Sequence, residues 1–112
     1  AGDPIFLQMQ AEERWDAIPG AESWETRNTR VTAALTRIHQ AHANQKVVAV
    51  VHGGVIGQIL AHATGASPFA FNGADNGSIS RIVLHQDGIK TRSFNDNVHV
   101  QSTLHSGSGQ LT

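Results

Sequence analysis

The clearest pattern along the chain is a stripe of apolar residues at helical spacing in its first half. The stripe consists of Trp24, Val31, Leu35 and Ile38. Ser23 precedes it as a candidate N-cap and Asn44-Gln45 follow it, so we predict one long helix between these limits. A shorter helix capped by Asp3 is expected before it. We expect the arginines of the long helix on its solvent side: Arg27, Arg30 and Arg37.

A different pattern follows, in which apolar residues are consecutive instead of periodic. Residues 47–51 are all valine or alanine, as expected of a strand that helices cover on both faces. His52 and Gly53-Gly54 interrupt the apolar run, and residues 55–63 then return to helical spacing, with Gly65 as a candidate left-handed cap. This order predicts a three-layer α/β/α arrangement around a central, mostly parallel strand.

The second half of the chain has the pattern of β-strands. Residues 79–84 and 89–94 flank Asp87-Gly88, a strong hairpin signal, and predict a C-terminal β-hairpin. Residues 101–112 are rich in serine and glycine and are expected to be disordered. We therefore expect a single domain over residues 1–100.

Composition narrows the class of protein. The chain has 112 residues, so it forms one domain at most, and its net charge of −1 gives no reason to expect nucleic acid or a membrane surface as partner. No cysteine is present, which excludes disulfides and thiolate metal sites. No apolar run approaches the roughly 20 residues needed to span a bilayer, and no signal peptide opens the sequence, so we expect a cytoplasmic location.

His52 is the strongest candidate for chemistry, because it follows the predicted central strand and precedes a helix. Ligands of α/β proteins bind at this end of the sheet, and the free N–H groups of a helix N-terminus favour an anion such as phosphate. An imidazole with a pKa of about 6.5 suits phosphate contact or acid–base work near neutral pH. Gly53 adds a backbone N–H. The alternative is a structural histidine whose ring satisfies a strand-end carbonyl.

Asn76 and Ser78 are weaker candidates for binding the same ligand. They precede the first hairpin strand, where their amide and hydroxyl groups can face the His52 turn. An ordinary turn that uses Asn and Gly for its geometry explains them equally well. Arg81 is expected on the solvent side of its strand.

Two other kinds of site are disfavoured. The glycines after His52 lack the spacing of a dinucleotide-binding fingerprint, and no acidic residue ends a second parallel strand about 20 residues later. The chain contains seven histidines, but their spacing matches no zinc pattern. We therefore predict no cofactor and no metal.

Four segments in register resemble the histidine phosphatase superfamily, in its phosphoglycerate mutase-like branch. They are Pro19-Gly20-Ala21-Glu22-Ser23 with Arg30-Val31, Val47-Val48-Ala49-Val50-Val51-His52-Gly53-Gly54-Val55-Ile56, Asn76-Gly77-Ser78-Ile79-Ser80-Arg81-Ile82, and Phe94-Asn95-Asp96-Asn97-Val98-His99-Val100. The resemblance covers residues 19–100 and concerns the C-terminal half of the family domain.

The resemblance implies a phosphatase or phosphomutase that acts through a phosphohistidine on a small phosphorylated substrate. His52 matches the second histidine of the family, which binds the phosphoryl oxygens and stabilises the transition state, and the Gly53 backbone matches beside it. The nucleophile of the family belongs to an Arg-His-Gly motif, which this sequence lacks. We therefore expect a fragment that is inactive alone.

Two alternatives remain open. The chain can be a non-catalytic α/β module that binds phosphate or a phosphorylated metabolite, or a dimerisation unit in which His52 is structural. A partial sheet would also leave an exposed strand edge, so we expect self-association through that edge.

Overall fold

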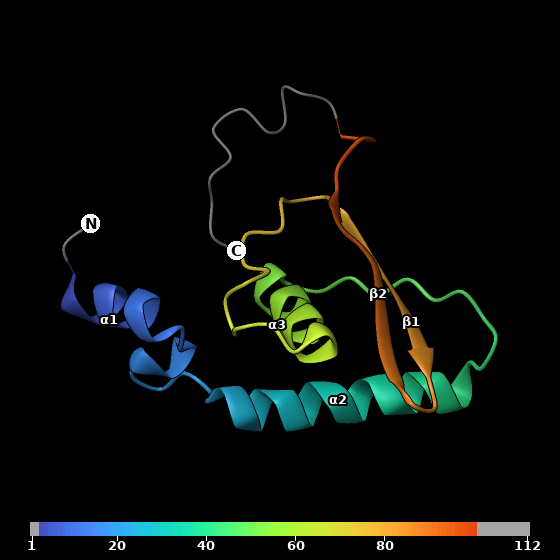
Figure 1. Cartoon of the computed structure of the whole chain (residues 1–112), viewed down its shortest axis with the longest axis horizontal. Coiled ribbons are helices and arrows are strands. Elements are labelled where there is room, and N and C mark those ends of the chain that lie inside the picture. Colours follow the sequence, from blue (N-terminus) through green and yellow to red (C-terminus); the bar gives the residue numbers. More distant parts are fainter. Residues whose placement is uncertain (1–2, 101–112) are drawn as a thin grey trace.

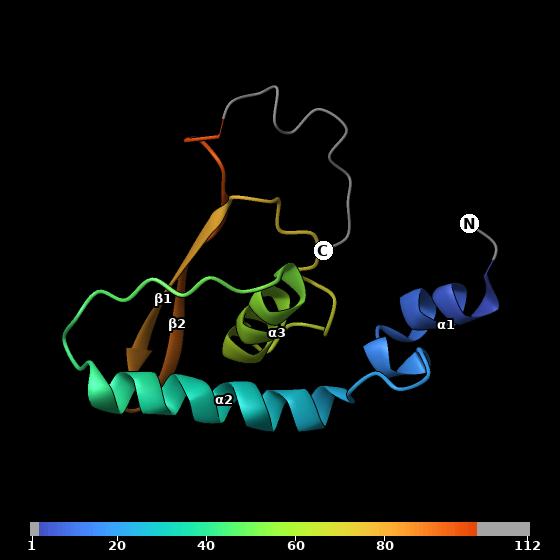
Figure 2. The same ribbon diagram turned by 180° about the vertical axis from the view of Figure 1, so that it is seen from behind.

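The computed structural model describes residues 3–100 of the chain. Its elements in order are α1 (Pro4–Glu12), a 3-10 turn (Trp15–Ala17), α2 (Trp24–Ala41), α3 (Gly53–Thr64), β1 (Ile79–His85) and β2 (Gly88–Asp96). The long helix α2 forms a base, and both α3 and the β1–β2 hairpin lie on the same side of it (Figures 1 and 2). The predicted mixture of helices and strands is therefore confirmed. The predicted tail, 101–112, lies outside the described residues.

Both N-terminal helices begin at the predicted caps. The Asp3 carboxylate accepts a hydrogen bond from the Ile5 amide at 2.8 Å, and the Ser23 hydroxyl accepts one from the Thr26 amide at 3.1 Å. These side chains satisfy amides that the first turn leaves unpaired. Helix α2 ends at Ala41, before the predicted Asn44-Gln45 limit.

The predicted C-terminal hairpin is confirmed. Strands β1 and β2 are antiparallel, and His85 pairs with Gly88 across a loop formed by Gln86 and Asp87. Gly88 has a φ of 143°, a conformation that favours glycine, so the Asp87-Gly88 signal marks the turn correctly. The strands run slightly beyond the predicted 79–84 and 89–94.

The predicted central strand is not formed among the described residues. Residues 47–51 are extended, yet they belong to no sheet and their backbone groups make no hydrogen bond to any other described residue. The Val48 and Val50 side chains are 86% and 96% exposed. The reason is that a strand needs a neighbour, and β1 and β2 pair only with each other in a two-stranded sheet. The helices and the hairpin are thus consistent with the predicted partial α/β fold, while its central strand is not paired within residues 3–100.

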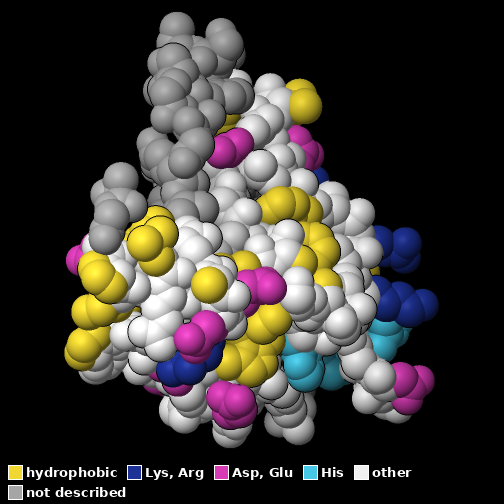
Figure 3. All heavy atoms as spheres, turned by 60° about the vertical axis from the view of Figure 1, so that its left-hand side comes forward, with side chains coloured by type: hydrophobic (Ala, Val, Ile, Leu, Met, Phe, Trp, Pro, Cys, Tyr) yellow, Lys and Arg dark blue, Asp and Glu magenta, His cyan; other side chains and the backbone are white. Residues whose placement is uncertain are grey.

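The buried core is centred on α3. Its buried members are Gly57, Gln58, Leu60 and Ala61, and Val31 of α2 and Ala74 of the loop before β1 are buried as well. Met9 is buried separately in α1, which packs on the 3-10 turn. Ring contacts extend this core, with Phe71 edge-on to Phe94 at 5.3 Å between centroids. Apolar side chains remain visible on the side of the molecule shown in Figure 3. The exposed apolar residues include Ile5, Phe6 and Leu7 of α1.

Candidate functional site at the start of helix α3

His52 is the N-cap residue of α3. Its backbone is extended, with φ −74° and ψ 155°, and its carbonyl accepts hydrogen bonds from the Val55 amide at 3.0 Å and the Ile56 amide at 3.2 Å. Its side chain makes no capping bond and is exposed. The imidazole is therefore available to a ligand, and the structural role as a ring that satisfies a strand-end carbonyl is not seen among the described residues.

Helix α3 begins at Gly53, two residues before the predicted start. The amides of Gly53 and Gly54 consequently belong to its first turn, and neither donates to another described residue. Free amides at a helix N-terminus carry partial positive charge and favour an anion. Two free amides therefore follow the exposed His52 in the chain, and amides of this kind can donate to the oxygens of an anion.

Arg27 of α2 lies close to Gly54, which contradicts its predicted solvent-facing position. One of its terminal nitrogens, Nη1, is 3.6 Å from the place that a Cβ atom on Gly54 would occupy. Arg27 precedes the buried Val31 by one helical turn, and residues four apart share a helix face. That spacing is the sequence signal that places Arg27 toward α3.

Arg27 is held there by a buried glutamine. Its Nε donates to Oε1 of Gln58, which is only 1% exposed, and Nε2 of Gln58 donates to the Trp24 carbonyl at 2.9 Å. Burial is the main influence on the guanidinium and lowers the pKa of Arg27, while the charge of Glu22 raises it. The predicted solvent-side placement is correct for Arg30 and Arg37, both of which are exposed.

Asn76 and Ser78 lie in the turn before β1. The Ser78 amide donates to the Asp75 carbonyl at 3.0 Å, and Gly77 has a φ of 78°. Asn76 is exposed, and the buried Ser78 hydroxyl has no hydrogen-bond partner among residues 3–100. Neither side chain is hydrogen-bonded to His52, so their role in binding remains a prediction.

A network that the sequence reasoning missed secures this turn. The Asp75 carboxylate accepts from the side-chain amides of Asn95 at 3.3 Å and Asn97 at 2.8 Å, and the Asp75 amide donates to Oδ1 of Asn95 at 2.8 Å. Nε2 of His99 lies 2.7 Å from the Gly77 carbonyl. Residues at and just after the end of β2 therefore hold the loop that carries Asn76 and Ser78 in place.

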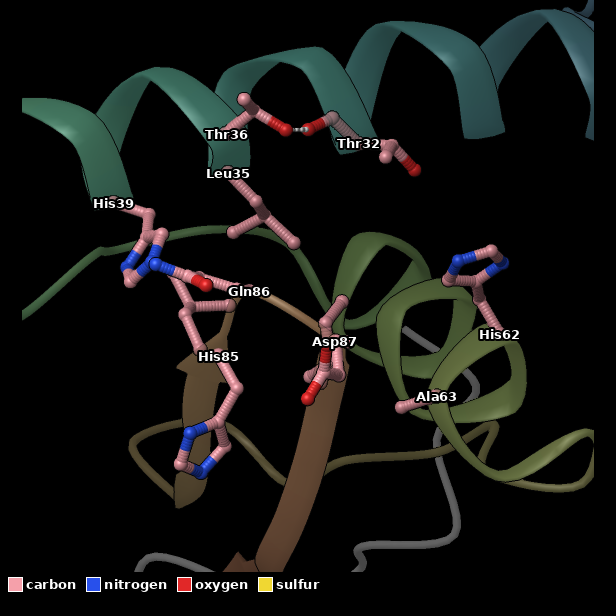
Figure 4. Close-up of a pocket in the computed structure, with 12 residues that line it drawn as sticks. Thr32, Leu35, Thr36, His39, His62, Ala63, His85, Gln86 and Asp87 are labelled. Atoms are coloured by element: carbon pink, nitrogen blue, oxygen red, sulfur yellow. Dashed lines mark hydrogen bonds between the residues drawn. The ribbon is translucent and has the colours of Figure 1, made fainter.

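Three histidines line a separate hollow between α2, α3 and the hairpin turn (Figure 4). They are His39, His62 and His85, and Asp87 lies beside them. Their rings do not converge on one point in this view. Within residues 3–100 no group of three or more His, Cys, Asp or Glu side chains has an arrangement that could hold a metal ion. No helix in this part of the chain has the length and apolar character needed to cross a membrane.

Comparison with known proteins finds a similarity to a phosphatase and to a family model. It is 28% identical over 87 residues to the uncharacterized phosphatase PhoE of Bacillus subtilis (strain 168), an alignment that covers 77% of this chain and 45% of that protein. The chain thus spans less than half the length of this curated relative. No solved structure matches it significantly. The model of the histidine phosphatase superfamily (branch 1) matches residues 3–97, and the chain therefore belongs to this superfamily.

Proposed function

We propose that this chain carries the C-terminal, second-histidine half of a phosphatase domain, and that His52 and Gly53 bind the phosphoryl group of a small phosphorylated substrate. The observation that supports this most directly is the exposed His52 ring beside the free amides of Gly53 and Gly54. Hydrolysis is preferred to phosphomutase activity because the similar PhoE protein is named as a phosphatase.

The proposed chemistry is stabilisation of charge on the transferred phosphoryl group. In phosphoryl transfer the charge is spread over equatorial oxygens, and donors fixed around those oxygens lower the barrier. The amides of Gly53 and Gly54 are such donors, and a ring N–H of His52 adds a third. No Arg-His-Gly tripeptide occurs in this sequence, so we assign the nucleophilic step to no residue of the chain.

Titration with inorganic phosphate tests the proposal. We expect the ¹H–¹⁵N signals of Gly53 and Gly54 and the ring signals of His52 to shift together and to saturate. The variant His52→Asn should bind phosphate more weakly, while His62→Asn should bind it normally, because His62 is an exposed histidine at the other end of α3. Unshifted signals at these three residues, or equal affinity of His52→Asn and the wild type, would contradict the proposal.

A non-catalytic phosphate-binding module is the second candidate, because the free amides of Gly53 and Gly54 can bind an anion without a reaction. The two candidates differ in one measurement. Incubation with a phosphoryl donor, in the presence of a separately supplied Arg-His-Gly-containing half of a family member, should produce phosphohistidine and phosphate release only if the chain completes an active site. Binding without turnover in that mixture would favour the module.

A further inference from the structure

We propose that Arg27 is an anion-binding residue of the His52 site, with its guanidinium directed at the oxygens of a phosphate held by the first turn of α3. This inference rests on the proposed function and deepens it, because it adds a positively charged group that comes from α2 instead of from the His52 turn itself.

The position of the guanidinium is fixed by its support. Gln58 is almost completely buried, and both ends of its amide are used, one by Arg27 and the other by the Trp24 carbonyl. A buried amide group with both ends paired has one favourable orientation, so it presents Oε1 to Arg27 in a constant place. The side chain of Arg27 is consequently preorganised, and little conformational entropy is lost when it meets a ligand.

The free part of the guanidinium faces the start of α3. Only Nε is hydrogen-bonded to another described residue, so the terminal nitrogens keep their donors. Nη1 lies 3.6 Å from the position that a Cβ atom on Gly54 would occupy, so the missing side chain leaves open space beside the guanidinium. The terminal nitrogens of Arg27 therefore lie near the N-terminal end of α3, where the free amides of Gly53 and Gly54 are.

The positive charge of Arg27 near the start of α3 favours the binding of an anion. Arg27 forms no ion pair with any described carboxylate, because the nearby Glu22 is held by both Nε and Nη2 of Arg30, at 3.1 Å and 2.8 Å. A half-buried cation beside the positive end of a helix dipole is unfavourable by itself. An anion bound between them interacts favourably with both, and arginine pairs well with the planar edge of a phosphate.

The contrast with the other arginines of α2 sharpens the assignment. Arg30 is exposed and is paired with Glu22, and Arg37 is exposed toward the end of the helix. Arg27 combines burial, a fixed anchor and free donors. Arg37 is therefore a matched control, since its replacement removes the same charge from the same helix at a position remote from α3's first turn.

The test is phosphate titration of the full chain, followed by the amide signals of Gly53 and Gly54 and the guanidinium signals of Arg27. In the wild type, all should saturate at the same phosphate concentration. Arg27→Gln should weaken phosphate binding about tenfold or more, as expected for losing a hydrogen bond to a charged group. Arg37→Gln should leave the affinity unchanged. Arg27→Lys, which keeps the charge without the planar anchor, should give an intermediate affinity.

The outcomes separate this inference from the proposed function. If phosphate shifts His52 and Gly53 in the wild type but leaves Arg27 unaffected, and Arg27→Gln binds normally, the role of Arg27 is refuted while the His52 site stands. If phosphate shifts none of these residues in the wild type, both are refuted. Should Arg27→Gln fail to fold, the guanidinium signals of the unaltered chain still decide, because they must move with bound phosphate.

Discussion

Residues 47–51 and helix α3 are neighbours in the sequence and are both rich in apolar residues, yet they behave in opposite ways. In α3, Leu60 and Ala61 are each 1% exposed, whereas Val50 in the preceding segment is 96% exposed. A helix satisfies its backbone hydrogen bonds internally and needs only a surface to cover its apolar face. A strand depends on a second strand for its hydrogen bonds. Hydrophobicity alone therefore does not determine whether a segment is buried.

The largest expected effect is the loss of a side chain from the core of α3. Leu60→Ala should lower the free energy of unfolding by about 2–5 kcal/mol, because a fully buried leucine leaves a cavity when it is truncated. Val48→Ala, in the exposed segment, should change it by less than about 0.5 kcal/mol. Urea denaturation followed by circular dichroism measures both. Equal effects would mean that residues 47–51 are packed in solution.

A smaller loss is expected when the polar anchor in the same helix is removed. Gln58→Met keeps the size of the side chain but leaves Arg27 Nε and the Trp24 carbonyl without their partner, which should cost about 1–3 kcal/mol. Gln40→Met on the exposed side of α2 is the control and should be nearly neutral. Equal stability of the Gln58 variant and the wild type would show that the buried hydrogen bonds contribute nothing net.

Self-association tests the exposed segment directly. We propose that residues 47–51 pair with the same segment of a second copy, because an unpaired extended backbone with apolar side chains is a template for strand addition. Sedimentation should show a concentration-dependent dimer in the wild type. The double variant Val48→Lys, Val50→Lys should be monomeric, since like charges oppose pairing. Val98→Lys, at an equally exposed valine outside this segment, should leave the dimer intact. A wild-type protein that stays monomeric at all concentrations would contradict this proposal.

Local chemistry made much of the fold predictable from the sequence. Asp3, Ser23 and Gly65 act at helix ends as expected, because caps depend on neighbouring backbone groups only. The hairpin was predictable for the same reason. The state of residues 47–51 was not, because it depends on strands elsewhere.

The candidate site divides in the same way. His52 and Gly53 were found because strand, histidine, glycine and helix are consecutive in sequence. Arg27 was assigned to the wrong face, although its four-residue spacing from Val31 indicates the buried side; its contact with Gln58 could not be predicted, because Gln58 lies on a different helix. The network of Asp75 with Asn95 and Asn97 joins residues from a loop and the end of β2, and no local pattern indicates it.

The smallest expected effect concerns the stability of the fold in acid. It involves Asp96 at the end of the hairpin away from its turn, where the two strands are paired, unlike residues 47–51. The hydrogen bond from Arg81 at 2.9 Å is the main cause that lowers the pKa of Asp96 below its ordinary 3.8, with the Val98 amide second. A carboxylate whose pKa is lower in the folded state stabilises the fold above its ordinary pKa, and this contribution is lost as the pH falls through the lowered value. Asp96→Asn should therefore reduce stability slightly at neutral pH and not at strongly acidic pH, because the pair is exposed to solvent. Thermal unfolding of both chains across this range measures the difference. A difference that persists in strong acid would mean that Asp96 acts through a contact other than its charge.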